Sequence, residues 1–380
     1  MGPGAGGISA ETHRFDQEME ELTLTGAGPA SPGVALSVLD LAVVAEGSTV
    51  GRALSESVDL ARAAESLGYR RFWVAEHHNM PGIASSATAV LIGAVADATT
   101  SLRVGSGGIM LPNQAPLVVV EQFGTLEAMH PGRIDLGIGR APGTDQVTAL
   151  ALRRSTEALA ADDFPQQLGE LLAFFTGTFP EGHPFRAITA VPGYGYQPEL
   201  WLLGSSGFSA QLAGLLGLPF SFAHHFSAAN TLPALALYRQ NFRPSATRAA
   251  PHAMVAVSVI CADTDEEAEW LAGPSRLAFV RLRSGRPGRL PTPEEAAAYQ
   301  YSPAEQLIVD GRTSGQIVGD PDTVRAGLEE LITRTEADEL MITAMIHGYD
   351  ARLRSFAQVA GLARGPRLRA APDPGSALTA

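Results

Sequence analysis

Short apolar runs alternate with longer segments in which apolar residues recur at helical spacing, from about residue 33 to residue 363. The segment from Ala53 to Leu67 is typical of an amphipathic helix, and it is followed by Gly68, a residue type that commonly ends helices. Short apolar runs bounded by turn residues predict buried strands. The predicted strands are Val34–Leu39, Arg71–Ala75, Leu102–Ser106, Ile134–Ile138, Leu200–Leu203, Phe220–Ala223, Ala253–Cys261 and Glu339–Thr343.

Strands that alternate with helices are typical of an α/β fold built from βα units. Eight such units over roughly 330 residues predict a closed (β/α)8 TIM barrel with insertions. A doubly wound open sheet is the alternative, but it usually carries a glycine-rich fingerprint after its first strand, and residues 34–46 lack one. We expect one barrel domain over residues 33–363, with 281–315 as an insertion and candidate lid, and flexible extensions at 1–32 and 364–380.

Composition excludes several classes of function. The net charge of −13 argues against a nucleic-acid partner, whose phosphates require a basic surface. The chain contains no lysine, which excludes Schiff-base aldolases, pyridoxal-phosphate enzymes and P-loop nucleotide enzymes, because each of these needs a lysine amine. The single cysteine, Cys261, excludes an internal disulfide, and its place at the end of an apolar run predicts a buried structural thiol.

The chain also carries no recognisable membrane or export signal. Its first 32 residues lack the apolar core of a signal peptide. No later run is long and apolar enough to resemble a membrane span. We therefore expect a cytoplasmic protein without a membrane partner.

The second predicted strand ends in a polar tip, Glu76, His77, His78 and Asn79. Adjacent strand residues point to opposite faces, so Glu76 and His78 share one side and His77 takes the other. This geometry argues against a metal site shared by the two histidines, and the usual metal-binding spacings are absent, so we expect no metal. Judged alone, a strand-end histidine is more often a structural residue than a catalytic one.

Other strand ends carry residues suited to an anion. Gly204, Ser205 and Ser206 directly precede a predicted helix, whose first N–H groups and dipole favour negative charge. Arg140 follows another strand and could add a charge-assisted hydrogen bond. Together they indicate a phosphate-bearing cofactor, although the same residues also form ordinary helix caps and turns. A histidine pair, which includes His225, follows the sixth strand.

Hydrolytic chemistry has little support in the sequence. The acidic residues of the predicted loops form no pair with the spacing of glycosidase carboxylates. No strand ends in the Gly-x-Ser-x-Gly motif of a hydrolase nucleophile. A bound organic cofactor gains support by elimination.

Four longer motifs stand at strand ends in the order expected for a barrel: Trp73–Asn79, Val104–Asn113, Pro131–Gly143 and Trp201–Ser206. Through them the chain resembles the bacterial-luciferase-like superfamily of flavin-dependent monooxygenases and related flavin or deazaflavin oxidoreductases, which are (β/α)8 barrels. The resemblance extends from about Val34 to Leu362. It is nearer to the small bacterial luciferase-like oxygenases than to the light-emitting luciferases.

The resemblance implies a catalytic role for His77, which would face the flavin ring and assist the step in which the flavin reacts with oxygen. It also implies a non-proline cis peptide bond between Gly107 and Gly108, beneath the ring. A reactive cysteine lies near the flavin in some luciferases, and the matching position in this chain is Gly139. Gly139 is therefore expected to contact the cofactor without thiol chemistry.

The resemblance also implies a site for the flavin phosphate. The arginine that meets the phosphate in luciferases matches Arg140, and a second phosphate-contacting arginine matches either Arg153 or Arg154. The loop that holds the phosphate matches Leu203, Gly204, Ser205, Ser206 and Ser209.

The function implied by the resemblance is that of a two-component monooxygenase. Such an enzyme takes reduced FMN from a separate flavin reductase and uses O2 to oxygenate a small organic substrate, such as an aromatic or natural-product compound. The alternatives are an oxidoreductase that uses F420 or NAD(P)H and a non-catalytic flavin-binding protein. Relatives are commonly homodimers. The aromatic candidates for a substrate pocket, most of which also fit core or loop packing, are Phe72, Trp73, Tyr194, Tyr196, Phe222 and Phe226.

Overall fold

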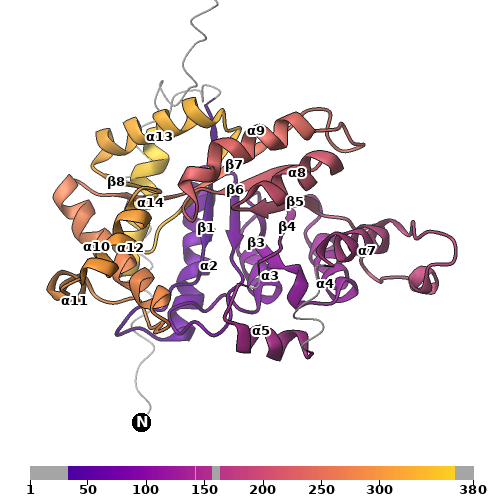
Figure 1. The fold of residues 1–380 in the computed structure, drawn as a ribbon, viewed down its shortest axis with the longest axis horizontal. Coiled ribbons are helices and arrows are strands. Elements are labelled where there is room, and N and C mark those ends of the chain that lie inside the picture. The colour runs from indigo at the N-terminus through magenta and orange to yellow at the C-terminus, as the bar shows by residue number, and fades with distance from the viewer. Residues whose placement is uncertain (1–32, 142, 156–162, 364–380) are drawn as a thin grey trace, which may run out of the picture.

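All strands of the sheet run parallel, and eight of them close into a barrel (Figure 1). The order around the barrel is β1-β2-β3-β4-β5-β6-β7-β9, and β9 pairs back onto β1. The predicted (β/α)8 barrel is therefore confirmed. The computed structural model describes residues 33–141, 143–155 and 163–363, so the predicted extensions at both ends lie outside the described residues. The strands are β1 (Ala35–Asp40), β2 (Arg71–Val74), β3 (Arg103–Met110), β4 (Ile134–Gly139), β5 (Glu199–Gly204), β6 (Phe220–Ala223), β7 (Ala253–Cys261), β8 (Gln316–Gly319) and β9 (Glu339–Thr343).

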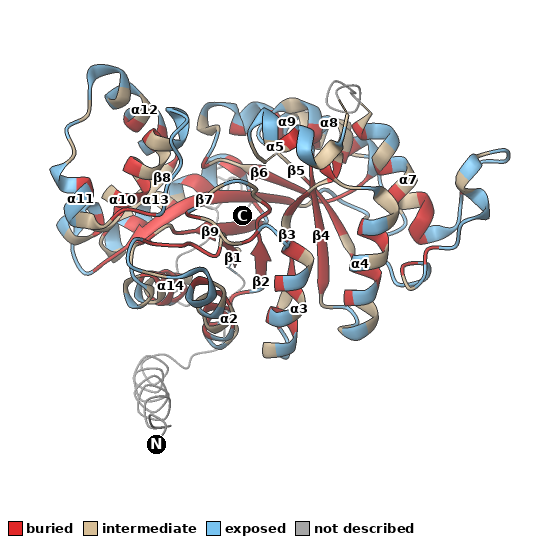
Figure 2. Cartoon of the chain, turned by 90° about the horizontal axis from the view of Figure 1, so that it is seen from below, coloured by how far each residue is buried: buried red, intermediate tan, exposed pale blue. Residues whose placement is uncertain are grey.

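Helices surround the barrel and connect its strands. Figure 2 shows the strands as mostly buried and the outward faces of the helices as exposed. Short 3-10 helices are found at Leu111–Asn113, Pro184–Ala187 and Ala228–Asn230. The α-helices are α2 (Val50–Ser66), α3 (Thr88–Ala98), α4 (Pro116–Met129), α5 (Gln146–Arg153), α7 (Phe164–Thr176), α8 (Gly207–Leu216), α9 (Thr231–Asn241), α10 (Asp265–Arg283), α11 (Pro293–Ala298), α12 (Pro303–Thr313), α13 (Pro321–Thr335) and α14 (Tyr349–Ala363).

Polar caps determine where several helices begin. The hydroxyl of Thr49 accepts a hydrogen bond from the backbone N–H of Arg52, and α2 therefore begins before the predicted start at Ala53. Asp320 caps α13, because its carboxylate accepts a hydrogen bond from the backbone N–H of Thr323 at 2.8 Å.

The short strand β8 was not predicted from the apolar pattern. It pairs with Ser258–Cys261 of β7, whereas β9 pairs with Met254–Ser258 of the same strand. β8 therefore extends the sheet beyond the barrel, and most of its residues are only half-buried. The segment between β7 and β8 contains α10, α11 and α12, which lie together at one side of the molecule (Figure 1).

The interior of the barrel is filled by side chains from alternate strand positions. The rings of Trp73 and Trp201 meet edge to face, with centroids 5.3 Å apart. Leu39, Met254 and Met341 pack against them. The remaining strand positions face the helices and form the larger apolar core.

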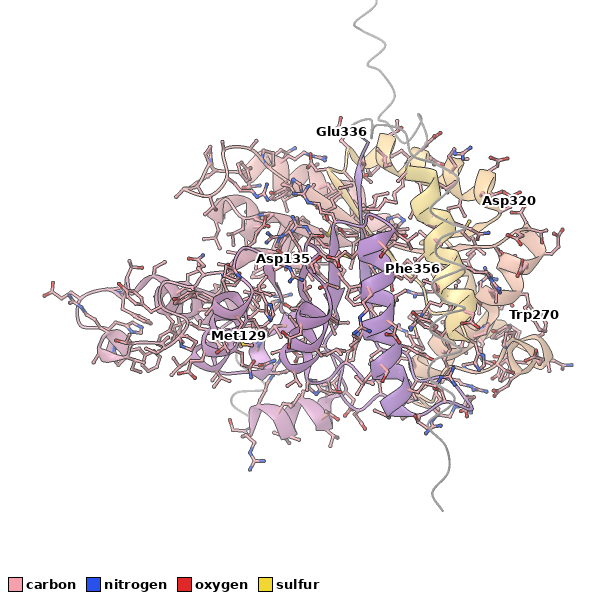
Figure 3. The ribbon with its side chains drawn as sticks, turned by 180° about the vertical axis from the view of Figure 1, so that it is seen from behind. Met129, Asp135, Trp270, Asp320, Glu336 and Phe356 are labelled. Atoms are coloured by element: carbon pink, nitrogen blue, oxygen red, sulfur yellow. The ribbon has the colours of Figure 1, made fainter. Side chains whose placement is uncertain are left out.

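A charged network closes the end of the barrel where the strands begin. Arg71 is fully buried, and its guanidinium lies 2.8 Å from Asp135 and 3.1 Å from Glu199 and Glu339. The indole N–H of Trp73 donates to Asp135, which lies near the centre of Figure 3. Burial disfavours the charge of Arg71, but the carboxylates outweigh burial and raise its pKa. This end of a TIM barrel contributes stability, whereas chemistry takes place at the other end.

The fold also accounts for the single cysteine. Cys261 is buried, as predicted, and burial together with nearby acids raises the pKa of its thiol to about 12, which fits a structural role. None of the described helices has the length and apolar character needed to cross a membrane.

Candidate functional site

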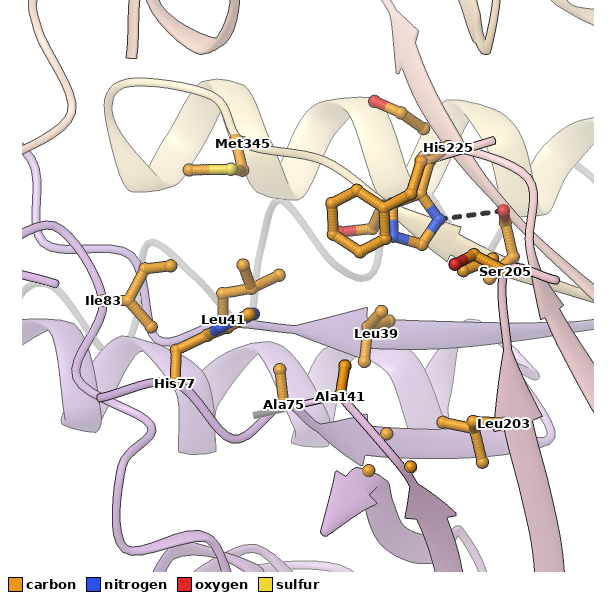
Figure 4. Close-up of a pocket in the computed structure, with 18 of the residues that line it drawn as sticks. Leu39, Leu41, Ala75, His77, Ile83, Ala141, Leu203, Ser205, His225 and Met345 are labelled. Carbon is orange, nitrogen blue, oxygen red and sulfur yellow. Dashed lines mark hydrogen bonds between the residues drawn. The ribbon is translucent and has the colours of Figure 1, made fainter. Parts of the chain in front are cut away.

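A cavity of about 380 Å³ lies at the ends of the strands from which the strand-to-helix loops depart (Figure 4). Its lining is mostly apolar, and in Figure 4 His77 and Ser205 lie at opposite sides of the view. With the exception of the second phosphate arginine, Arg153 or Arg154, the residues that the sequence singled out as catalytic or cofactor-binding line this cavity. These residues are His77, Gly107, Gly108, Gly139, Arg140, Leu203, Gly204, Ser205, Ser206 and Ser209.

The inward register of β2 carries His77 into the cavity. Trp73 and Ala75 line the cavity, and His77 continues this alternation just beyond the end of the strand. Glu76 is buried on the other side, where its carboxylate lies 3.0 Å from Nε2 of His78. The predicted separation of His77 from Glu76 and His78 is therefore confirmed.

His77 is held in one tautomer. Its Nδ1 lies 3.2 Å from the carbonyl oxygen of Gly143. A carbonyl oxygen only accepts, so Nδ1 carries the hydrogen and Nε2 keeps a lone pair. Burial lowers the pKa of His77, and neighbouring His78 adds to this effect, while the hydrogen bond to Gly143 opposes it. His77 is therefore neutral near neutral pH and able to accept a proton at Nε2.

Glu76 holds the loop after β3 and does not line the cavity. Its carboxylate accepts hydrogen bonds from the backbone N–H of Met110 at 3.1 Å and from the side-chain amide of Gln114 at 2.8 Å. Burial raises the pKa of Glu76, and its hydrogen bonds limit the rise. Glu76 and His78 thus fix the end of β2 relative to the end of β3.

The peptide bond between Gly107 and Gly108 is cis, as the resemblance implied. Neighbouring strands approach both residues closely. A Cβ atom on Gly108 would lie 2.7 Å from the carbonyl oxygen of Gly137, and one on Gly107 would lie 2.6 Å from a methyl carbon of Leu39. Glycine is therefore required here by the space available between the strands.

Hydrogen-bond donors converge at the start of α8. The N-cap residue Ser206 makes no side-chain cap hydrogen bond. Within the described ranges, the hydroxyls of Ser205, Ser206 and Ser209 have no hydrogen-bond partner. The guanidinium of Arg140 stands over the ring of Phe208, 4.3 Å from its centroid. The helix dipole, the hydroxyls and the guanidinium all favour an anion, so these residues fit the phosphate of a cofactor.

Comparison with protein families agrees with this geometry. A family model described as luciferase-like monooxygenase matches residues 34–339, which is most of the chain. The chain belongs to this family. Membership confirms the resemblance carried by the four strand-end motifs and identifies the protein class as an oxidoreductase. The matched range includes the whole barrel up to the first residue of β9.

Individual relatives cover nearly the same range. A protein of Escherichia coli (strain K12) described as a luciferase-like monooxygenase is 51% identical over 323 residues, which are 85% of this chain and 95% of the relative. The crystal structure of apo-MsnO8 superposes with a TM-score of 0.79 at 38% identity and covers 87% of this chain and 98% of its own. Both comparisons place the family barrel over nearly the full length of the relatives.

More distant solved structures show the fold alone. The oxygenating constituent of 3,6-diketocamphane monooxygenase from Pseudomonas putida, in complex with FMN, has a TM-score of 0.62 at 20% identity and covers 86% of this chain and 97% of its own. An F420-dependent secondary alcohol dehydrogenase in complex with an F420-acetone adduct has a TM-score of 0.63 at 13% identity and covers 88% and 100%. Proteins with this barrel thus include FMN-binding and F420-dependent enzymes.

His225 lines the cavity of this luciferase-like barrel, although sequence reasoning assigned it no role. Its Nδ1 lies 2.9 Å from the carbonyl oxygen of Ala256, so Nδ1 carries the hydrogen. Burial, reinforced by the charge of Arg312, lowers the pKa of His225 to about 3. The histidine pair after β6 was visible in the sequence, but only the structure shows that His225 is buried and neutral.

Two more lining residues, Phe279 and Arg312, come from the segment between β7 and β8. No motif in the sequence pointed to either of them. A usable signal was nevertheless present, because Ser302 and Glu305 form a capping box that begins α12. That box predicts a helix inside the expected insertion 281–315, and the helix carries Arg312 to the cavity.

Some candidates lie away from the cavity. Neither Arg153 nor Arg154 lines it, and the guanidinium of Arg153 donates to the side-chain oxygen of Asn113 at 3.2 Å. Of the aromatic candidates, Trp73 and Phe226 line the cavity. The others are the buried Phe72 and Phe222, which belong to the core, and the exposed Tyr194 and Tyr196.

Proposed function

We propose that this protein is a two-component flavin-dependent monooxygenase. It takes reduced FMN from a separate flavin reductase and uses O2 to insert one oxygen atom into a small organic substrate. The observation that carries the proposal is the cavity of this luciferase-like barrel, which holds a neutral histidine and a set of donors suited to a phosphate. Residue geometry and family membership support the same chemistry.

Arg140 and the serine loop hold the phosphate of the cofactor in this proposal. Arg140 supplies a fixed positive charge, and Ser205, Ser206 and Ser209 supply hydroxyl donors at the start of α8. Bound reduced FMN supplies the electrons that activate O2. The remaining cofactor-binding residues are Gly107, Gly108, Gly139, Leu203 and Gly204.

His77 is the proposed catalytic residue, and it acts on protons. Its hydrogen bond to Gly143 presents an imidazole that is protonated at Nδ1 and has a lone pair at Nε2. Because burial keeps this imidazole neutral, it can accept a proton in the cavity and return it later in the cycle. A positioned histidine of this kind typically contributes about 100- to 10,000-fold to a rate.

The apolar lining supports chemistry that must exclude water. Leu41, Ile83 and Met345 stand with His77 in the cavity (Figure 4). Leu290 joins the lining from the predicted insertion 281–315, which supports the role of that segment as a lid. Removing water protects a reactive oxygen species from side reactions.

The sequence favours an external supply of reduced flavin. No glycine-rich dinucleotide fingerprint follows the first strand, which favours a separate reductase over an internal nicotinamide site. The homodimer and the cytoplasmic location stay predictions, and size-exclusion chromatography with light scattering tests the first of them.

A binding and turnover experiment tests the proposal. Anaerobic titration with reduced FMN compares wild type with Arg140→Met and a Ser205→Ala/Ser206→Ala double variant, and Ser66→Ala on the outer helix α2 is the control. We expect each site variant to bind roughly 10-fold or more weakly. With a flavin reductase, isotope-labelled O2 and a panel of organic substrates, wild type should transfer one labelled oxygen atom. Absence of reduced-FMN binding, or bound reduced FMN that is inert to O2, contradicts the proposal.

The F420-dependent structural neighbour gives one alternative a specific basis. A hydride-transferring enzyme on this barrel reduces or oxidises its substrate without consuming O2. Stopped-flow reduction of the bound cofactor, with a secondary alcohol or NAD(P)H as donor, separates the two chemistries. A non-catalytic flavin-binding protein would keep its biological role after His77→Ala, whereas the monooxygenase would not.

A further inference from the structure

Arg312 is a buried guanidinium with no acidic partner among the residues that the structure describes. It lies in the last turn of α12, lines the cavity and is only 8% exposed. One N–H group donates to the backbone carbonyl of His225 at 2.6 Å, while the Nε atom has no hydrogen-bond partner. Its flanks are aromatic, because the guanidinium carbon lies 4.9 Å from the ring centroid of Phe279 and 5.9 Å from that of Phe226.

The other buried arginines show how unusual this arrangement is. Among the described residues, Arg71 and Arg352 are also buried, and each faces a carboxylate. Arg71 contacts several acids, and Arg352 lies 3.4 Å from Asp40. No described carboxylate is in ion-pair contact with Arg312. Burial accordingly lowers the pKa of Arg312 to about 10, with no acid to oppose the shift. An unpaired buried charge is costly, and an anionic ligand that reaches Arg312 would offset that cost.

The charges of the cavity lining also favour an anionic ligand. The chain carries a net charge of −13, yet none of the described aspartates or glutamates lines the cavity. Two arginines of the described part of the chain line it. Arg140 lies in the loop after β4, and Arg312 lies in the helix α12. A cofactor phosphate at Arg140 and the serine loop accounts for one positive charge and leaves Arg312 for a second anion.

We propose that Arg312 binds the carboxylate of an organic-acid substrate whose apolar part fills the cavity beside the cofactor. The assignment of this anion to the substrate rests on the proposed function, in which Arg140 holds the cofactor phosphate. A guanidinium presents paired N–H donors that match the two oxygens of a carboxylate. Phe279 and Leu282 on α10 provide apolar surface for the rest of such a molecule.

The test uses hydrocinnamate and its neutral amide, which share an apolar body and differ in charge. Their binding to the protein, with and without FMN, is measured by isothermal titration calorimetry. A salt bridge in a buried site predicts that wild type binds the carboxylate roughly 10- to 100-fold more tightly than the amide. Equal binding of the two probes by wild type, or no binding of the carboxylate, overturns the proposal.

Variants locate the site of the carboxylate. Arg312→Met should bind both probes within about twofold of each other, and Arg312→Lys should recover part of the preference. Arg325→Met, on the exposed surface of α13, is the control and should behave as wild type. If Arg312→Met proves unstable, Arg312→Lys and wild type are compared with the same two probes. A carboxylate preference that is unchanged in Arg312→Lys then overturns the proposal. A preference that survives in Arg312→Met overturns the proposal.

FMN titration distinguishes failure of this inference from failure of the proposed function. If Arg312→Met loses FMN binding and keeps the carboxylate preference, Arg312 serves the cofactor and the inference is wrong. If Arg140→Met rather than Arg312→Met abolishes carboxylate binding, the probe occupies the phosphate site and the inference is again wrong. If wild type binds no FMN but prefers the carboxylate in a way that depends on Arg312, the proposed flavin function is contradicted and the anion site at Arg312 is supported.

Discussion

The Nδ1 atom of His77 lies 3.2 Å from the carbonyl oxygen of Gly143, so the loop after β4 orients a side chain at the end of β2. The backbone of the same region is tied down as well. The hydroxyl of Ser86 donates to the carbonyl oxygen of His77 at 2.8 Å, and that of Thr144 donates to the carbonyl oxygen of His78 at 2.9 Å. These contacts fix the tautomer and the position of the imidazole.

Replacement of His77 by glutamine should abolish proton transfer while it preserves polarity and size. We expect turnover to fall by about 100-fold or more, with reduced-FMN affinity changed by less than about threefold. Product formation in the reductase-coupled assay and anaerobic titration measure the two quantities. His183→Gln, at a position that does not line the cavity, is the matched control. Turnover that stays within a factor of a few of wild type would remove His77 from the mechanism.

Alanine at Gly108 should disrupt the floor of the cavity. Its Cβ would lie 2.7 Å from the carbonyl oxygen of Gly137 in β4 and 3.1 Å from the side chain of Leu203 in β5. The carbonyl of Gly137 belongs to a strand inside the sheet, so it cannot move freely to make room. We expect Gly108→Ala to lower the free energy of unfolding by about 1–3 kcal/mol and to weaken FMN binding. Gly169→Ala, on α7 with no atom near the added Cβ, should be neutral or stabilising by up to about 1 kcal/mol. Urea denaturation of both variants measures the difference, and equal stabilities would contradict the steric argument.

Loss of Arg71 should destabilise the barrel without acting on the cavity directly. Arg71→Met leaves Asp135, Glu199 and Glu339 without their shared cation, and we expect a loss of about 3–5 kcal/mol in the free energy of unfolding. The control is Arg334→Met, which removes an exposed pair with a helical neighbour and should cost less than about 1 kcal/mol. Chemical denaturation compares the two. A similar, small effect of both substitutions would show that the buried network contributes little.

His225 should make the protein sensitive to acid. Its pKa is about 3 in the folded state against an ordinary value of 6.5, so between these values the unfolded chain binds a proton that the folded protein does not. The free energy of unfolding therefore falls as the pH is lowered, by about 2 kcal/mol from this group between about pH 7 and pH 5. His225→Gln should remove this part of the pH dependence, because glutamine does not titrate. Urea denaturation across this range measures the slope, and a slope equal to that of wild type would contradict the assignment.

The strand-end residues could be predicted because two simple rules act together. Side chains alternate along a strand, and parallel strands of a barrel end at the same rim. The alternation of side chains separated His77 from Glu76 and His78, and the family resemblance then assigned His77 to the cofactor side. Trp73, Ala75 and His77 line the cavity in agreement with both. The helix start at Thr49 shows the limit of this reading, because apolar spacing alone ignores a polar cap.

Arg312 and β8 could not be found in this way. Arg312 reaches the cavity from a helix inside a region that is rich in proline, glycine and arginine, and its meaning depends on the absence of nearby acids, which is a three-dimensional property. β8 has only four residues, and most of them are half-buried, so it lacks the continuous apolar run that identified the other strands. Both depend on contacts between segments that are far apart in the chain.

The pairing of β7 with two successive strands has a consequence for how this family can diversify. β7 leads into α10, and β8 returns to the end of β7, so the chain between them leaves and rejoins the molecule at one place. An exchange of α10, α11 and α12 between relatives would therefore leave the ladder between β7 and β9 intact. Under the proposal that Arg312 binds the substrate, exchange of this segment would alter substrate preference while the β7–β9 ladder stays in place.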